Sequence, residues 1–397
     1  MLTRPFSSRP ALVTASSSLL SLLVAGCGGE RQNGPAVDAG SVSSTPTFEI
    51  SLRSGRVERG ALMGGARVFV QLDRGRMYIY RRADGPRVEL VSETTNGKPA
   101  QVVWAQALPD TTIATYDFRG RRVVVFDTAG AVVRTTSLQA STGTPGPVAA
   151  FGDGRMVVLR DFMPSPYAQE TGEYSDTTVL MPVSSDARDT GPTIPVRTAQ
   201  RFGALDAQRT SDEVPRRHAG INVVGGVFDG RARHSIKVPL SPTTAVGATA
   251  DGFYVGRSDS AEVRFLDPSG HELRRFSIAE AALPVDSAVK ARLRRPREND
   301  LGISFADLYR QVRIPDSTPR YHQLRADHAG RLWVEIYSLD EQAPSRWAVY
   351  SRDGTRLGAV TLPAWTRLLD ASDAELLVIR PGALGAELVQ VLRYRLD

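Results

Sequence analysis

Residues 327–334 read Asp327-His328-Ala329-Gly330-Arg331-Leu332-Trp333-Val334, a tight acidic turn followed by a dense apolar strand. Asp and Gly favour tight turns, and aromatic, aliphatic and β-branched residues favour strands, so this stretch predicts part of a β-hairpin. The same order of turn and strand occurs six times along the chain. The other copies are residues 72–80, 110–116, 153–159, 251–256 and 373–379. A short β-unit is therefore repeated.

A second pattern follows the first at three places, as an apolar strand, a turn with Gly and an alternating strand. Its copies are Val123–Gly130 with Val132 and Val133, Val263–Gly270 with Leu273 and Phe276, and Trp347–Gly354 with Leu357 and Val360. Together the two patterns predict antiparallel sheets of three or four strands. One such sheet cannot cover both of its faces, whereas radial stacking of like sheets buries them. We therefore expect an all-β propeller.

The number of blades follows from the positions of the acidic turns, which stand at residues 73, 110, 153, 251, 327 and 373. The short intervals match a blade of about 40–50 residues, and they favour six blades. The longest interval contains a further hairpin, Ile221–Phe228 and His234–Leu240, which leaves seven blades as the alternative. We expect Phe48–Leu52 to pair with the last unit and close the ring, because closure hides exposed sheet edges.

One helical segment is predicted between the late blades, over Ala279–Arg295. Asp286 is a suitable start, Pro296 a suitable stop, and Leu283, Val285, Val289 and Leu293 form an apolar stripe. The segment also carries the densest run of charge, which includes Arg292, Arg294, Arg295 and Arg297. Such runs usually face water. The alternative is a docking surface for a protein or for an anionic partner such as lipid headgroups or an acidic polymer.

The N-terminus predicts export. Arg4 and Arg9 precede a mostly apolar segment, Ala11–Ala25, which is too short to span a bilayer as a helix. It ends in Leu23-Val24-Ala25-Gly26-Cys27. This end resembles the lipobox of bacterial lipoproteins, and the resemblance implies that Cys27 is lipidated and that residues 1–26 are removed as a signal peptide.

The polar residues after Cys27 predict a flexible tether over 27–47, followed by the propeller over 48–397. Two or more acyl chains would hold the protein on a membrane almost permanently. In the lipoproteins, Asp after the cysteine often causes retention in the inner membrane. Gly28 stands there instead, which favours an outer membrane facing the periplasm if the cell has two membranes.

Charge and cysteine content exclude some classes of function. The formal charge is +6, and the arginines are scattered among Asp and Glu. Nucleic-acid binding needs them on one face with aromatic platforms, so we expect no nucleic-acid partner. Cys27 is the only cysteine, which excludes a disulfide within the chain and a cysteine metal site.

The Asp-x-Gly strand followed by Phe-Asp-x-x-Gly, as in Phe126–Gly130, resembles the NHL-like six-bladed propellers. The stretch Asp316–Val334 resembles one blade of the lipoprotein members. The likeness covers nearly all of residues 48–397, and its motifs are specific for fold and weak for function. Relatives include binding scaffolds, sensors, lactonases and a streptogramin lyase.

No motif of a hydrolase elbow, a zinc protease, a phosphate loop or an EF-hand is present. Tyr321–Arg325 is expected to be an innermost strand, so that His322 and Arg325 are candidates for lining the central channel. We assign no catalytic residue, no metal ligand and no cofactor. The sequence thus favours a membrane-anchored, non-catalytic binding or scaffold propeller. The alternative is a metal-dependent lactonase- or lyase-like enzyme with its site at the channel.

Overall fold

The structure of the protein is a computed structural model. It describes residues 39–52, 55–83, 87–91, 100–109, 111–138, 145–161, 172–174, 177–188, 191–197, 201–206, 223–228, 231–294, 312–340 and 342–396. The first half contains β1 (Ala39–Gly40), β2 (Phe48–Leu52), β3 (Val57–Met63), β4 (Arg67–Leu72), η1 (Asp73–Gly75), β5 (Met77–Arg81), β6 (Arg87–Leu90), β7 (Val102–Ala107), β8 (Ile113–Asp117), β9 (Arg122–Phe126), β10 (Val132–Ser137), β11 (Pro145–Ala150), β12 (Met156–Asp161), β13 (Gly172–Tyr174), β14 (Thr177–Val183) and β15 (Ile194–Arg197). The second half contains β16 (Arg201–Asp206), β17 (Val223–Phe228), β18 (Arg231–Lys237), β19 (Thr244–Ala248), β20 (Phe253–Arg257), β21 (Glu262–Leu266), β22 (Glu272–Ser277), α1 (Ser287–Leu293), β23 (Tyr321–Ala326), β24 (Leu332–Ile336), β25 (Ser345–Tyr350), β26 (Arg356–Leu362), β27 (Arg367–Ala371), β28 (Glu375–Pro381), η3 (Ala383–Gly385) and β29 (Glu387–Arg393).

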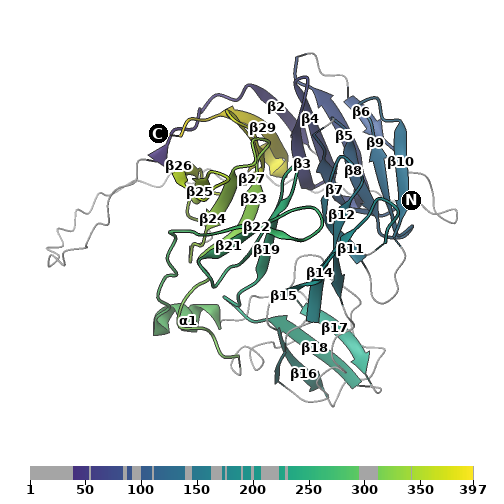
Figure 1. Ribbon diagram of the computed structural model, residues 1–397. Helices are drawn as coiled ribbons and strands as arrows, with labels where there is room; N and C mark the ends of the chain where they lie inside the picture. The colour runs from purple at the N-terminus through teal and green to yellow at the C-terminus, as the bar shows by residue number, and fades with distance from the viewer. Residues whose placement is uncertain are drawn as a thin grey trace, which may run out of the picture. The chain divides into compact units, whose positions relative to one another are not determined.

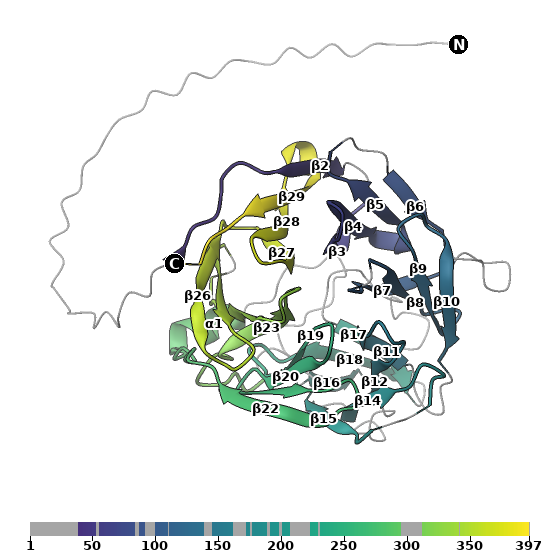
Figure 2. The ribbon, with the colours of Figure 1, turned by 45° about the horizontal axis from the view of Figure 1, so that its top comes forward.

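Six antiparallel sheets stand in a ring and form a six-bladed β-propeller (Figure 2). From the innermost strand outward, the blades are β3-β4-β5-β6, β7-β8-β9-β10, β11-β12-β14-β15, β19-β20-β21-β22, β23-β24-β25-β26 and β27-β28-β29-β2. We number them blade 1 to blade 6 in this order. The prediction of an all-β propeller with six blades is confirmed.

The core consists of six apolar clusters, each between two successive blades. Between blades 5 and 6, for example, Trp333 and Trp347 pack with Leu376 and Val378, and all four are fully buried. Each sheet therefore buries both faces against its neighbours. This explains why the second and third strands of most blades are rich in apolar residues on both faces.

The turns at Asp327 and Asp127 share one hydrogen-bonding pattern. The Oδ1 of Asp327 accepts from the backbone N–H of Ala329 and Arg331, at 3.0 and 2.9 Å. Gly330 takes a positive φ of 79°, which glycine adopts without a steric penalty. Asp127 forms the same turn between β9 and β10, at 2.8 and 2.9 Å. The first repeat is out of phase, because Asp73 lies between β4 and β5 rather than after an innermost strand.

The N-terminal segment closes the ring (Figure 1). As predicted, β2 is the outermost strand of blade 6 and pairs with β29. Upstream, β1 pairs in parallel with β26 of blade 5, and the N–H groups of Ser43 and Thr47 donate to carbonyls of the segment around β29. Residues 39–52, which we call the strap, therefore join the outer edges of blades 5 and 6. Residues 39–47 fall in the range predicted to be a tether.

The alternative of seven blades is wrong. The hairpin that suggested a further blade is formed by β17 and β18, but these strands pair with β16 and β13 in a separate sheet. Its strands come from two insertions, one between β12 and β14 and one between β15 and β19. In the described structure, the strands β13, β16, β17 and β18 pair with one another and with no strand of a blade. This sheet therefore adds no blade to the ring.

The helical insert lies where it was predicted, between β22 and β23, but α1 covers Ser287–Leu293 rather than Ala279–Arg295. Leu283 and Val285 precede its first turn and are not part of the helix. Asp286 is its N-cap, because its side chain accepts from the N–H of Val289 at 2.7 Å. Val289 and Leu293 pack on a small cluster that contains Val285, whereas Leu283 is exposed. Pro296 lies outside the described residues. In the described part of the chain, no helix has the length and apolar character needed to cross a membrane.

Candidate functional site

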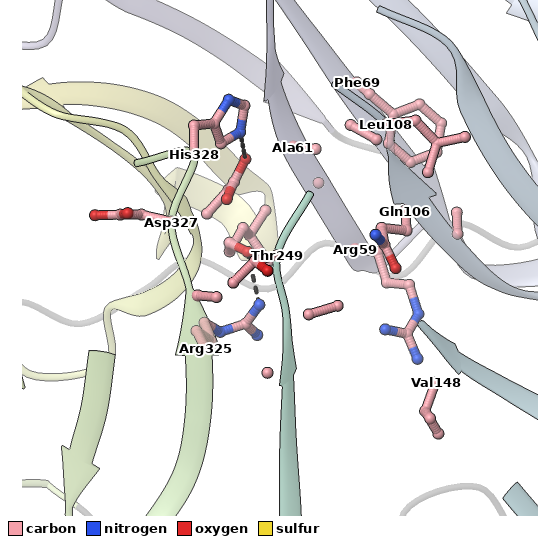
Figure 3. Close-up of a pocket in the computed structure, with 18 of the residues that line it drawn as sticks. Arg59, Ala61, Phe69, Gln106, Leu108, Val148, Thr249, Arg325, Asp327 and His328 are labelled. Carbon is pink, nitrogen blue, oxygen red and sulfur yellow. Dashed lines mark hydrogen bonds and ion pairs between the residues drawn. The ribbon is translucent and has the colours of Figure 1, made fainter. Parts of the chain in front are cut away.

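A cavity of about 470 Å³ lies at the centre of the ring and is lined by residues from all six innermost strands (Figure 3). Its volume is in the range of small-molecule sites. Its polar lining includes Arg59 from β3, Gln106 from β7, Arg325 from β23, and Asp370 from β27. Small residues such as Gly247 of β19 keep the centre open.

Bulges shape this lining. The pairing register shifts once on five of the innermost strands, namely β3, β7, β11, β23 and β27. A bulge opposes two residues to one and turns side chains out of the strict alternation of a strand. On β23 the extra residue is His322, so that His322 and Gln323 both reach the carboxylate of Glu335. On β3 it is Glu58, next to Arg59.

Two arginines point into the cavity from opposite sides (Figure 3). The Nη1 of Arg325 donates to the carbonyl of Leu369 at 2.7 Å, which fixes its guanidinium between blades 5 and 6. Burial is the main cause that lowers the pKa of Arg325; the charge of Asp370 opposes this shift, and the charge of Arg59 adds to it. Burial is also the main cause that lowers the pKa of Arg59, although its side chain is open to the solvent in the channel.

A histidine and an aspartate meet at the edge of the same cavity. The Nε2 of His328 lies 3.0 Å from the Oδ2 of Asp370. Asp370 is held in place because it also accepts from the N–H of Leu62 at 2.8 Å and of Ala371 at 2.9 Å. The hydrogen bond to Asp370 is the main cause that raises the pKa of His328, against an opposing effect of burial. This pair can exchange a proton with a group in the cavity.

Asp327 also lines the cavity, but it points away from it (Figure 3). Its fully buried carboxylate accepts from Arg331 Nε at 2.6 Å and from Trp333 Nε1 at 2.9 Å. The carboxylate of Asp327 therefore stabilises the turn and the core of blade 5 and is not directed at a ligand in the cavity.

The structure separates the residues that the sequence suggested. Tyr321–Ala326 is the innermost strand of blade 5, and Arg325 lines the cavity. His322 is not among the lining residues; its side chain is 68% exposed and its Nδ1 lies 2.9 Å from Glu335 Oε2. Arg292 and Arg294 are exposed on the last turn of α1, while Arg295, Arg297 and Cys27 lie outside the described residues.

Sequence reasoning missed Arg59, His328 and Asp370. His328 had a usable signal, because it follows an innermost strand directly and stands in the turn at the channel. Asp370 and Arg59 had none, since a bulge decides which side of the strand each residue faces, and bulges cannot be counted from alternation alone.

The lining does not fit a divalent cation. Two guanidinium groups face the space that the ion would occupy. Among the residues that the structure describes, no group of three His, Cys, Asp or Glu side chains is close enough to hold a metal ion. Oxygen and imidazole ligands in such numbers are what divalent cations require.

No protein-family model matches the chain, and no curated protein matches it in sequence. Similar solved structures include a DUF4221 family member from Bacteroides vulgatus, with 10% identity, coverage of 90% of this chain and 99% of that one, and a TM-score of 0.49. A Bacteroides fragilis protein named as exported has 10% identity, coverage of 93% and 98%, and a TM-score of 0.47. A gluconolactonase from Xanthomonas campestris has 11% identity, coverage of 92% and 99%, and a TM-score of 0.42. At these identities the likenesses concern the fold alone.

Proposed function

We propose that the protein is a lipid-anchored, extracytoplasmic propeller that binds a small polar ligand in its central channel. The observation that carries this proposal is the cavity of about 470 Å³, to which every blade contributes its innermost strand. Guanidinium groups bind and orient polar ligands through a fixed fork of donors. The described lining offers these binding groups and a single acid–base pair.

The anchoring part of the proposal rests on the sequence. The segment ending at Cys27 has the order of a lipoprotein signal peptide. The twelve residue-to-residue steps from Cys27 to Ala39 can span at most roughly 40 Å. Because β1 is fixed to the outer edge of blade 5, this length limits how far the ring can stand from the membrane.

The second candidate is an enzyme with its site in the same channel. Its specific support is the pair of His328 and Asp370, because a histidine oriented by a carboxylate is a common general base. As the lining does not fit a metal ion, the metal-dependent form of this alternative has weaker support than one based on proton transfer.

The run of arginines at and after the end of α1 is the basis of a separate proposal for a partner. Arg292, Arg294, Arg295 and Arg297 would dock an anionic surface at the rim. Replacing all four by Gln should reduce retention on vesicles that contain anionic lipid, with unchanged melting temperature. Unchanged retention would contradict this docking role.

The binding proposal is tested on residues 37–397, which form one compact unit that contains the strap and all six blades, by thermal shift against a panel of small polar compounds. A compound that raises the melting temperature of the wild type should lose its effect in Ala250→Trp, because exposed Ala250 lines the cavity and a large side chain there obstructs it. Ala374→Trp is the matched control, since Ala374 is exposed in a turn and does not line the cavity. Shifts that survive in Ala250→Trp, or no shift with any compound, would contradict the proposal.

A further inference from the structure

We propose that the ligand of the central channel is a small organic anion, whose carboxylate or phosphate group is held between Arg59 and Arg325. This inference rests on the proposed function and specifies the chemical class of its ligand. The supporting observation is that some charged side chains that line the cavity have hydrogen-bond partners in the protein, whereas others have donors without a described partner.

Arg325 presents a donor edge that the protein does not use. Its Nη1 is bonded to Leu369 O, so the guanidinium is fixed before any ligand arrives. Its Nε is buried and has no hydrogen-bond partner in the described structure. Its Nη2 is not buried in this way and donates to no described group, so an acceptor oxygen in the cavity can reach it.

Arg59 is the complementary group on the other side. In the described part of the chain, no hydrogen bond or ion pair engages its guanidinium. Arg59 and Arg325 come from blades 1 and 5, and each faces the same space (Figure 3). Two cations that share a partly desolvated space favour an anion between them, and guanidinium forks match the oxygens of carboxylate and phosphate.

Most of the nearby carboxylates already have hydrogen-bond partners, although the charge of Asp370 also acts on Arg325. Asp370 is bonded to His328 and to two backbone N–H groups, and Asp327 is bonded to Arg331 and Trp333. Glu58 is different, because it is exposed beside Arg59 and has no hydrogen-bond partner in the described structure. The negative charge of Glu58 should therefore repel an anionic ligand. A variant that removes this charge should bind the ligand more tightly, whereas one that removes Arg59 should bind it more weakly.

The experiment is isothermal titration calorimetry on residues 37–397 at low ionic strength, with inorganic phosphate, succinate and the neutral analogue succinamide as probes. Succinate or phosphate should bind the wild type, and succinamide should not. Arg59→Gln should weaken binding by at least roughly tenfold, as expected for a lost charge-assisted contact. Glu58→Gln should tighten it, and Arg346→Gln, which changes an exposed arginine outside the cavity, should leave it unchanged.

Arg325→Gln should have the same effect as Arg59→Gln if it folds. Arg59 makes no hydrogen bond in the described structure, and its described electrostatic partner is exposed Glu58, so Arg59→Gln keeps the test valid if Arg325→Gln does not fold. Equal affinity for succinate and succinamide, or Arg59→Gln behaving like Arg346→Gln, overturns the anion assignment. If the anion assignment fails but compounds of the thermal-shift panel bind and Ala250→Trp blocks them, the proposed ligand-binding function still holds. If no anion and no panel compound binds, both the anion assignment and the proposed function are wrong.

Discussion

His328 Nε2 lies 3.0 Å from Asp370 Oδ2, and this contact joins the first turn of blade 5 to the innermost strand of blade 6. The carboxylate also accepts from the N–H of Leu62 in blade 1. Three blades thus meet at one carboxylate at the edge of the channel. The pair links the stability of the ring to pH, in addition to its place beside the candidate ligand site.

The first prediction concerns that pH dependence. The hydrogen bond to Asp370 raises the folded-state pKa of His328 above its ordinary value of 6.5, and the charges of Asp327 and Asp373 act in the same direction. A group with a raised folded pKa stabilises the protein fully below its unfolded pKa, and the contribution is lost as pH rises through the folded pKa. The melting temperature of His328→Gln should therefore fall below that of the wild type at pH 5.5 and approach it at pH 8.5.

The matching variant is Asp370→Asn, which removes the partner and should remove the same pH dependence. Arg82 and Glu375 are also close to His328, but they form their own ion pair at 2.6 Å. A difference in melting temperature between the wild type and His328→Gln that grows as the pH rises would contradict the raised pKa of His328.

The second prediction compares two aspartates in the same kind of turn. Asp327 is fully buried and bonded to Arg331 and Trp333, whereas Asp127 is partly exposed and, among the described residues, bonds only to backbone of its own turn. Asp327→Ala should lower the free energy of unfolding by about 3 kcal/mol, because Arg331 Nε and Trp333 Nε1 lose a buried charged acceptor, although Arg331 keeps its bonds to Ser372 and Tyr394. Asp127→Ala should cost about 1 kcal/mol. Urea denaturation at constant m-value measures both, and equal costs would show that the buried network is unimportant.

The third prediction concerns the strap. A Cβ added at Gly40 would lie 2.3 Å from the carbonyl oxygen of Arg395 and 3.0 Å from that of Ala359. Gly40→Ala should therefore release β1 and lower stability by about 1–3 kcal/mol. Hydrogen exchange of residues 39–47 should become faster. Gly146→Ala is the control, because nothing lies within 4 Å of a Cβ there; equal exchange in both variants would contradict the strap's role.

The fourth prediction concerns the anchor. Cys27→Ser removes the thiol that would carry the lipid, so the protein should leave the membrane fraction and lose the mass of the acyl groups. Fractionation and intact-mass spectrometry of the wild type and the variant measure both. A wild-type chain that begins at a residue other than Cys27, or that carries no lipid, would contradict lipoprotein processing.

The fold could be predicted from the sequence because its signals are local and repeated. Asp-x-x-Gly turns such as Asp327–Gly330 and Asp267–Gly270 fix hairpins by bonds within the turn, and the apolar strands between them identify the blades. Asp286 as a helix start and Phe48–Leu52 as the closing strand were predicted for the same reason. The out-of-phase turn at Asp73 shows the limit, since a similar turn can occur between different strands.

The candidate site was predictable only in part. Arg325 could be placed on an innermost strand, but its neighbour Arg59 comes from a blade more than 250 residues away in the chain. The sequence predicted that His322 and Arg325 both line the channel. A bulge at His322 instead directs its side chain to Glu335. Contacts between blades and bulge positions depend on tertiary packing, which single-strand patterns do not contain.

The most direct test of the central claim is calorimetric titration of succinate into residues 37–397 in buffer that contains EDTA. If the channel binds an anion through its own arginines, succinate should bind one to one with the same affinity in the presence and absence of EDTA. Binding that disappears in EDTA and returns with a divalent cation would contradict this account, and would place a metal-dependent site in the channel instead.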